Sequence, residues 1–215
     1  MADVFNSFFV EKIANLRSRV KKSYTTDPME KIKMTSKPKR PFTLRTTTEE
    51  NVIKLIKATK SKDSAGMDDI SSKILKMSAE VLSIPLTRVI NTSITTGVFP
   101  KRWKIAKVTP VLKKGDSKSK SNYRPVALLP AFSKVLEAVV HQQIMFHVEK
   151  EGILPRTQHG FRRHRSTNSA LLYLTSKWEE WLQRKLNVGM LVFDLSAAFD
   201  CLDAEILDKK LEHLL

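Results

Sequence analysis

Apolar residues recur with helical spacing along most of the chain, so the pattern predicts a mainly helical protein. Near the start, the stripe consists of Phe5, Phe9, Ile13, Leu16 and Val20. These positions are three or four apart, which places them on one face of a helix over residues 3–19. The simplest interpretation is a helix that packs on the body of the protein.

The pattern stops at residues 21–40, where lysines dominate and Pro28 and Pro38 interrupt a stretch with few apolar positions. This composition is typical of a linker or an extended arm. We therefore expect residues 1–40 to form an N-terminal helix and a basic linker, with the main body beginning at residue 41.

Three helices are predicted in the first half of the body. Thr47 and Glu50 have the spacing of a capping box, so the first helix is expected to begin there. The second is expected over residues 70–82. Pro85 suits the first turn of the third, which should end at Gly97.

Three more helices are predicted downstream. The first follows Pro130, the second begins after Ser166, and the last begins after Asp203; Ser166 and Asp203 are both suitable N-caps. The buried face of the first of these helices should hold Val135, Leu136, Val139, Val140, Ile144 and Val148.

Two segments are predicted to be strands. Residues 104–112 are β-branched and interrupted by lysines, with Pro110 near an edge or an end. Residues 115–122 are polar and should form the tip of a hairpin or a loop. Residues 188–193 are a short apolar run that ends at Asp194.

Composition adds a large positive charge. The 38 Lys and Arg residues against 22 Asp and Glu residues give a formal charge of +16. Such a surplus indicates either a polyanionic partner or simply a soluble surface. The distribution favours the first, because basic residues cluster at 101–124 and 156–165, whereas acids dominate from Trp178 onward.

Other features narrow the protein class. The single cysteine, Cys201, excludes an internal disulfide and a cysteine-rich zinc site. No apolar run approaches the roughly 20 residues that span a bilayer, and no secretion signal is evident. We therefore expect an intracellular protein, in the nucleus or the cytoplasm, with no membrane partner.

The segment that ends at Asp194 carries the main candidate for chemistry. Met190, Val192 and Asp194 would share one face of a strand. A carboxylate held at the end of a rigid apolar strand suits a magnesium ligand. Alternatively, Asp194 caps a turn, and the residues alone leave both interpretations open.

Several blocks in order resemble one family. Residues 193–200 (Phe-Asp-Leu-Ser-Ala-Ala-Phe-Asp) resemble the first catalytic motif of reverse transcriptases, especially those of non-LTR, or LINE-type, retrotransposons. Residues 99–116 and 122–137 resemble two fingers motifs, residues 158–167 a template-side loop, and residues 5–9 and 64–68 segments upstream of the fingers. The ordered set covers nearly the whole chain.

This resemblance implies an α+β fold of the right-hand polymerase type. Residues 41–187 would be the fingers, mainly helical with a small antiparallel hairpin. Residues 188–215 would be the first strand and helix of a truncated palm. The complete enzyme, an RNA-directed DNA polymerase and nucleotidyltransferase of a transposable element, would take an RNA template, a DNA primer, a dNTP and Mg²⁺.

The resemblance also implies roles for individual residues. Asp194 would be the catalytic carboxylate that binds both metal ions, with the backbone of Leu195 as a further ligand. The nucleotide would contact Arg124 and Lys113 (or Lys114) at its triphosphate and Phe199 at its sugar. Contacts to nucleic acid would come from Gln158, Gly160, Arg162, Arg163 and Arg165.

The family's second carboxylate motif, Tyr-x-Asp-Asp, does not occur in these 215 residues. Since two-metal chemistry from one strand carboxylate is implausible, we expect a polymerase fragment that is inactive by itself. The alternative is a non-catalytic remnant that binds nucleic acid. The sequence gives no indication of oligomeric state.

Overall fold

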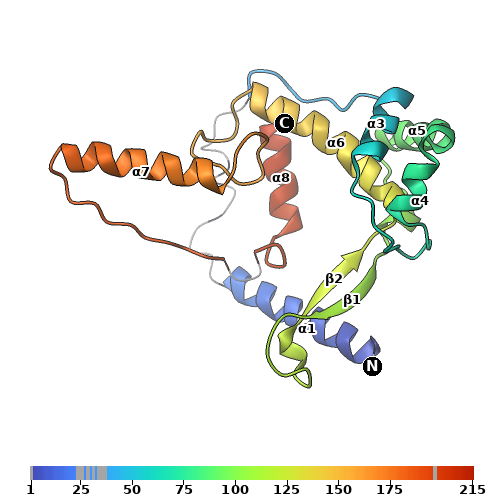
Figure 1. Cartoon of the computed structure of the whole chain (residues 1–215), viewed down its shortest axis with the longest axis horizontal. Coiled ribbons are helices and arrows are strands. Elements are labelled where there is room, and N and C mark those ends of the chain that lie inside the picture. The colour runs from blue at the N-terminus through green and yellow to red at the C-terminus, as the bar shows by residue number, and fades with distance from the viewer. Residues whose placement is uncertain (1, 23–26, 28–29, 31, 33–37, 196–197) are drawn as a thin grey trace.

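The computed structural model describes residues 2–22, 27, 30, 32, 38–195 and 198–215. The helices are α1 (Ala2–Lys22), α3 (Glu49–Ala58), α4 (Ser72–Met77), α5 (Ala79–Thr96), α6 (Ala131–Lys150), α7 (Thr167–Gln183) and α8 (Ala204–Leu214). Short 3-10 helices, η1 (Lys101–Lys104) and η2 (Lys120–Asn122), precede the strands β1 (Lys107–Leu112) and β2 (Tyr123–Leu128). The fold is thus helical with one small antiparallel sheet (Figure 1). Most of the predicted linker lies outside the described residues.

The hydrophobic core lies among α3, α4, α5 and α6, which gather on one side of the molecule (Figure 1). Its buried members are Val52, Ile56, Leu75, Ala79, Leu86, Ile90, Ala131, Val135, Leu136 and Val139. They converge because each helix spaces its apolar positions three or four apart and so turns them to one face. At the edge of the core, the rings of Trp103 and Phe132 stack with centroids 6.2 Å apart.

Helix α6 is the longest of the core helices and confirms its predicted apolar face only in part. Val135, Leu136 and Val139 are buried, whereas Ile144 and Val148 are half-buried. The reason is that α6 extends beyond the helices that cover its first half (Figure 1).

The predicted hairpin is confirmed. Strands β1 and β2 pair antiparallel and project from the core (Figure 1). Pro110 lies opposite Pro125 in the register, so the two residues that cannot donate a backbone hydrogen bond face each other. Both strands are also edges, where proline is tolerated.

Helix α1 packs on this hairpin, as its apolar stripe predicted. The ring of Phe5 meets Tyr123 edge-on at 4.9 Å between centroids, and Phe9 is buried. Two predicted N-caps are also confirmed: Ser166 forms a capping box with Ser169 at α7, and Asp203 accepts from the Glu205 and Ile206 N–H groups at α8. Among the described helices, none has an apolar stretch long enough to cross a membrane.

Two predictions for the first helices are wrong. The N-cap of α3 is Thr48, which accepts from the Asn51 N–H at 3.3 Å. Thr47 instead exchanges hydrogen bonds with Asn91 on α5: its N–H donates to the amide oxygen at 2.8 Å and its carbonyl accepts from the amide nitrogen at 3.0 Å. A tertiary partner has therefore displaced the local capping box.

The break expected between residues 82 and 85 lies instead at Ser78, between α4 and α5, and Pro85 lies inside α5. Proline removes one helical hydrogen bond, and both Pro85 and Val81, whose carbonyl would accept that bond, are exposed residues. Burial of Ser83 and Leu86 on the other face keeps the helix continuous. Its predicted end is confirmed by Gly97, which has φ of 68°.

The strand predicted at residues 188–193 does not form, since residues 186–195 have no regular secondary structure. The side chains from Met190 to Phe193 are 59–84% exposed. A strand is stable only when a neighbour supplies its hydrogen bonds and another layer covers one face. The described residues provide neither next to this segment.

Candidate nucleic-acid interface

The hairpin brings two predicted nucleotide ligands together at the end away from the core. Arg124 lies opposite Val111 in the register, and Lys113 follows β1 and donates its backbone N–H to the Asn122 carbonyl at 2.8 Å. Both cationic side chains are exposed, as is that of the alternative, Lys114. This end of the hairpin can therefore offer several cations to one anionic ligand.

The loop between α6 and α7, residues 151–166, is called the basic loop below. Within it, the side chain of Arg162 makes its hydrogen bonds to other groups of the protein. Its Nε and Nη2 donate to the two carboxylate oxygens of Glu149 on α6, at 2.8 and 2.5 Å. Its Nη1 donates to the Pro155 carbonyl at 2.8 Å, and the side chain is only 10% exposed. A guanidinium matches a carboxylate in this two-point geometry. Arg162 thus ties the loop to α6, a position that does not favour the predicted phosphate contact.

The Glu149–Arg162 pair makes this loop sensitive to acid. Hydrogen bonding to Arg162 lowers the pKa of Glu149 below its ordinary value of 4.5. A carboxyl group with a lowered pKa stabilises the fold above its unfolded pKa and loses that contribution as pH falls through its folded pKa. We therefore expect the loop to detach from α6 only at a pH below 4.5.

An acid titration of the Arg162 Nε–H resonance by NMR measures this transition. Glu149→Gln removes the titrating group while keeping the side chain's size, so the same transition should vanish. Its persistence in Glu149→Gln would show that another group controls the loop.

Arg165 and His159 join the loop to α7. The Nη1 of Arg165 donates to the Arg156 carbonyl at 2.6 Å and lies 3.4 Å from the Nε2 of His159. The other ring nitrogen of His159 lies 2.7 Å from the Ser169 hydroxyl. Arg165 is half-buried, so only part of its guanidinium faces solvent.

The tip of the loop points to solvent. Gly160 has open space around it, because no atom lies within 4 Å of the position that a Cβ would take. Phe161 adopts φ of 59° and is 89% exposed, and Arg163 is exposed. Gln158 is half-buried, with its amide 3.5 Å from the Gly160 carbonyl. Of the three arginines predicted to contact nucleic acid (Arg162, Arg163 and Arg165), Arg163 is the one with no hydrogen bond or ion pair within the described ranges.

Asp194 and Leu195 lie on the exposed coil after α7, and Phe199 lies in the turn before α8. The ring of Phe199 meets Phe161 edge-on, with centroids 6.3 Å apart. This contact places Phe199 beside the basic loop. Asp194 makes no hydrogen bond or ion pair with Lys113 or Arg124 in the part of the chain that the structure describes.

The described residues do not form a metal site. No three His, Cys, Asp or Glu side chains among them lie close enough together to hold an ion. Catalysis by two metals needs carboxylates that hold both ions, and Asp194 alone offers one. The described residues therefore do not complete a two-metal site around Asp194, and its role as a metal ligand stays a prediction.

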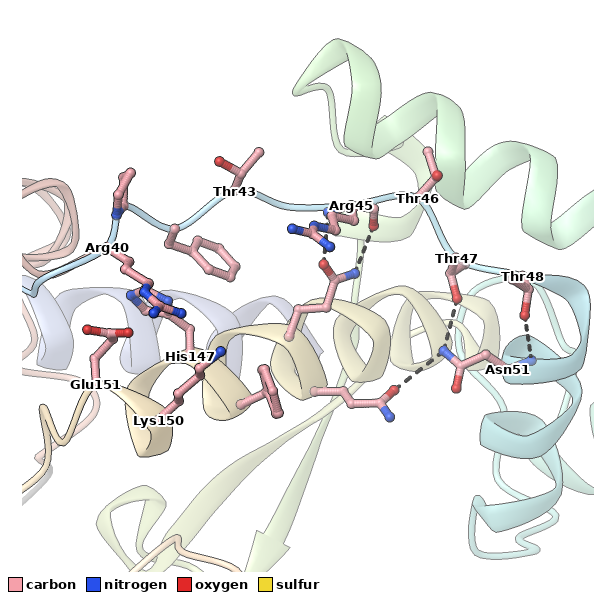
Figure 2. Close-up of a pocket in the computed structure, with 15 residues that line it drawn as sticks. Arg40, Thr43, Arg45, Thr46, Thr47, Thr48, Asn51, His147, Lys150 and Glu151 are labelled. Carbon is pink, nitrogen blue, oxygen red and sulfur yellow. Dashed lines mark hydrogen bonds between the residues drawn. The ribbon is translucent and has the colours of Figure 1, made fainter.

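A groove that the sequence did not predict lies between residues 40–48 and α6 (Figure 2). It encloses about 680 Å³ and is lined by basic, amide, hydroxyl and aromatic side chains. Of the lining residues, Arg40 is the last residue of the predicted linker, and the others belong to the predicted body. The alternation of half-buried Phe42 and Leu44 with exposed Thr43 and Arg45 was the signal for an ordered extended segment.

Comparison with known proteins gives one consistent result. Residues 111–214 match the family of reverse transcriptases (RNA-dependent DNA polymerases). This segment contains the distal end of the hairpin, the basic loop and the segment with Asp194 and Phe199.

Individual relatives come from mobile elements of Drosophila. The chain is 28% identical, over 82% of its length, to a probable RNA-directed DNA polymerase from transposon BS of Drosophila melanogaster. It is 29% identical, over 76% of its length, to the RNA-directed DNA polymerase from mobile element jockey of Drosophila funebris. A putative 115 kDa protein in type-1 retrotransposable element R1DM is 37% identical over 54% of the chain. The matches span 19%, 17% and 11% of these relatives, respectively.

Proposed function

From the likeness of the chain to reverse transcriptases of non-LTR retrotransposons, we propose that it is a template-binding part of an RNA-directed DNA polymerase. In this proposal residues 41–187 are the fingers and residues 188–215 are the start of the palm. The chain by itself binds single-stranded nucleic acid and does not polymerise. RNA template, DNA primer, dNTP and Mg²⁺ are the partners of the complete enzyme.

One observation carries this proposal: the family match covers the two places where the structure exposes clustered cations, the end of the hairpin and the basic loop. Exposed guanidinium and ammonium groups suit sequence-independent contacts to phosphate. Arg163 contributes its whole guanidinium to such contacts, and Arg165 contributes the part that the loop leaves free. Gln158 and Gly160 lie beside them and would face the template.

The nucleotide site is assigned to the hairpin. Arg124 and Lys113 would contact the triphosphate of an incoming nucleotide, and Phe199 would lie against its sugar. Asp194, with the Leu195 backbone, would supply ligands to Mg²⁺ once other carboxylates complete the site. Because the described residues gather no group of three possible metal ligands, binding is the activity that this arrangement supports.

Binding of a fluorescent single-stranded RNA to the purified chain tests the proposal. We expect affinity to fall linearly with salt on a log–log plot, with a slope of about 0.7 for each phosphate neutralised. Arg163→Ala should reduce both the affinity and the slope, whereas Arg88→Ala, which removes an exposed charge on α5, should change neither. A primer-extension assay with Mg²⁺ should give no product. Absence of RNA binding at low salt, or template-dependent synthesis, would contradict the proposal.

A further inference from the structure

In the groove of Figure 2, side-chain amides bind the backbone of the segment 40–48 and so hold it in place. Gln143 on α6 binds both backbone groups of Arg45: its amide oxygen accepts from the N–H and its amide nitrogen donates to the carbonyl, each at 2.8 Å. Asn91 holds Thr47 in the same way, and the Glu151 carboxylate accepts from the Lys39 N–H at 3.2 Å. These hydrogen bonds therefore hold the extended segment along α6. A site built in this way needs little ordering when a ligand binds.

The lining of the groove carries an excess of positive charge. Arg40, Arg45 and Lys150 line it, against a single carboxylate, Glu151, which already accepts a backbone hydrogen bond. His147 lines the groove from α6, and its shielded Nε2 has no hydrogen-bond partner in the part of the chain that the structure describes. The groove thus offers several cations to a ligand. An anionic ligand with hydroxyl groups fits this chemistry.

Two aromatic rings in the same groove indicate which kind of anion would fit it. Phe42 packs against the His147 ring at 5.3 Å between centroids, and Phe146 is 69% exposed. The Lys150 ammonium lies 5.7 Å from the centre of the Phe146 ring. An exposed ring with a cation beside it can stack a base and hold the adjoining phosphate, which is how proteins bind single strands without sequence preference.

The position of the groove sets it apart from the hairpin. Figures 1 and 2 show the segment 40–48 on one side of α6 and the hairpin on the other. Lys150 and Glu151, at one end of the groove, lie where α6 meets the basic loop. The volume of about 680 Å³ lies within the range of ligand clefts, roughly 300–1,000 Å³. A strand held by the loop can therefore continue into the groove.

We propose that this groove is a second binding surface for single-stranded RNA, which extends the contact made by the basic loop along α6. The proposal deepens the proposed function and rests on it. It assigns phosphate contacts to Arg40, Arg45 and Lys150 and base stacking to Phe146.

The test uses the full chain and two single-stranded RNAs, of about 5 and about 16 nucleotides, lengths at the two ends of the usual range of single-strand site sizes. Lys150→Ala and Phe146→Leu should each weaken binding of the longer RNA about tenfold while leaving the shorter RNA, held by the loop, unchanged. Phe146→Trp, which keeps a stacking surface, should retain the affinity. Arg88→Ala is the matched control for the lost charge, and thermal melts check that each variant is folded.

The outcomes separate the two proposals. If the groove variants bind the longer RNA as the unaltered chain does, the groove proposal is wrong and the loop proposal stands. If Arg163→Ala has no effect but the groove variants do, the loop assignment is wrong and the groove proposal is supported. No RNA binding by the unaltered chain overturns both. Equal competition by a poly-glutamate peptide, insensitive to Phe146→Leu, would identify a general polyanion site and overturn the assignment to RNA.

Discussion

Replacing Leu136 by alanine is expected to lower the free energy of unfolding of the helical core by about 2–5 kcal/mol. Leu136 is 2% exposed and belongs to the core cluster formed by α3, α4, α5 and α6. The loss combines the transfer free energy of the removed atoms with the cost of the cavity that remains. Because the hairpin and the basic loop are both attached to α6, the same variant should also weaken RNA binding.

Urea unfolding followed by the fluorescence of Trp103 measures this effect, since that ring packs at the edge of the core. Trp178 and Trp181 on α7 should first be replaced by phenylalanine so that Trp103 alone reports. Leu172→Ala is the control, because Leu172 is exposed on α7 and its loss should change stability by about 0.5 kcal/mol or less. Equal losses in the two variants would show that the core does not lie where the structure places it.

The second large effect is expected at Gly66, in the Ser64–Asp68 segment that resembles a family motif. A Cβ at Gly66 would lie 2.7 Å from the Pro130 nitrogen and 2.9 Å from the Leu129 carbonyl carbon. Both are backbone atoms, so a side-chain rotation cannot relieve the overlap. Gly66→Ala should therefore destabilise the protein by about 1–3 kcal/mol, the usual cost of overpacking.

The matched control is Gly160→Ala, which places the same methyl group in open space. Its effect on unfolding should stay within about 0.5 kcal/mol. Leu129 and Pro130 connect the hairpin to α6, so Gly66→Ala should also shift the backbone amide NMR signals of that junction, and Gly160→Ala should not. Similar melting curves for the two variants would remove the packing explanation for Gly66.

The family motifs can be recognised from the sequence alone, whereas their positions in space come only from the structure. The blocks around Phe193–Asp200 and Asn122–Glu137 resemble those of reverse transcriptases, and the sequence alone shows this because the order of residue types is itself the signal. The arrangement of those blocks in space is a different matter. Asp194 and Leu195 lie on exposed coil, and Arg162 binds Glu149 rather than facing solvent.

Errors in the sequence interpretation have one physical source, the competition between local and tertiary partners. Thr47 has the spacing for a capping box, but Asn91 binds its backbone and leaves Thr48 as the cap. Pro85 predicts a helix start, but α5 continues through Pro85 because one face of this helix is buried in the core. Residues 188–193 have the apolar character of a strand, yet a strand requires a paired neighbour.

The sequence by itself determined the resemblance to reverse transcriptases, the helices whose apolar positions recur three or four apart, the hairpin with its cations, and the caps at Ser166 and Asp203. These features depend on neighbours within a few residues, which a linear pattern records. Only the tertiary structure decided that Glu149 holds Arg162, that Gly66 touches the start of α6, and that residues 40–48 form a basic groove with α6. Those contacts join residues far apart in the chain, and their energies depend on distances that no spacing in the sequence specifies.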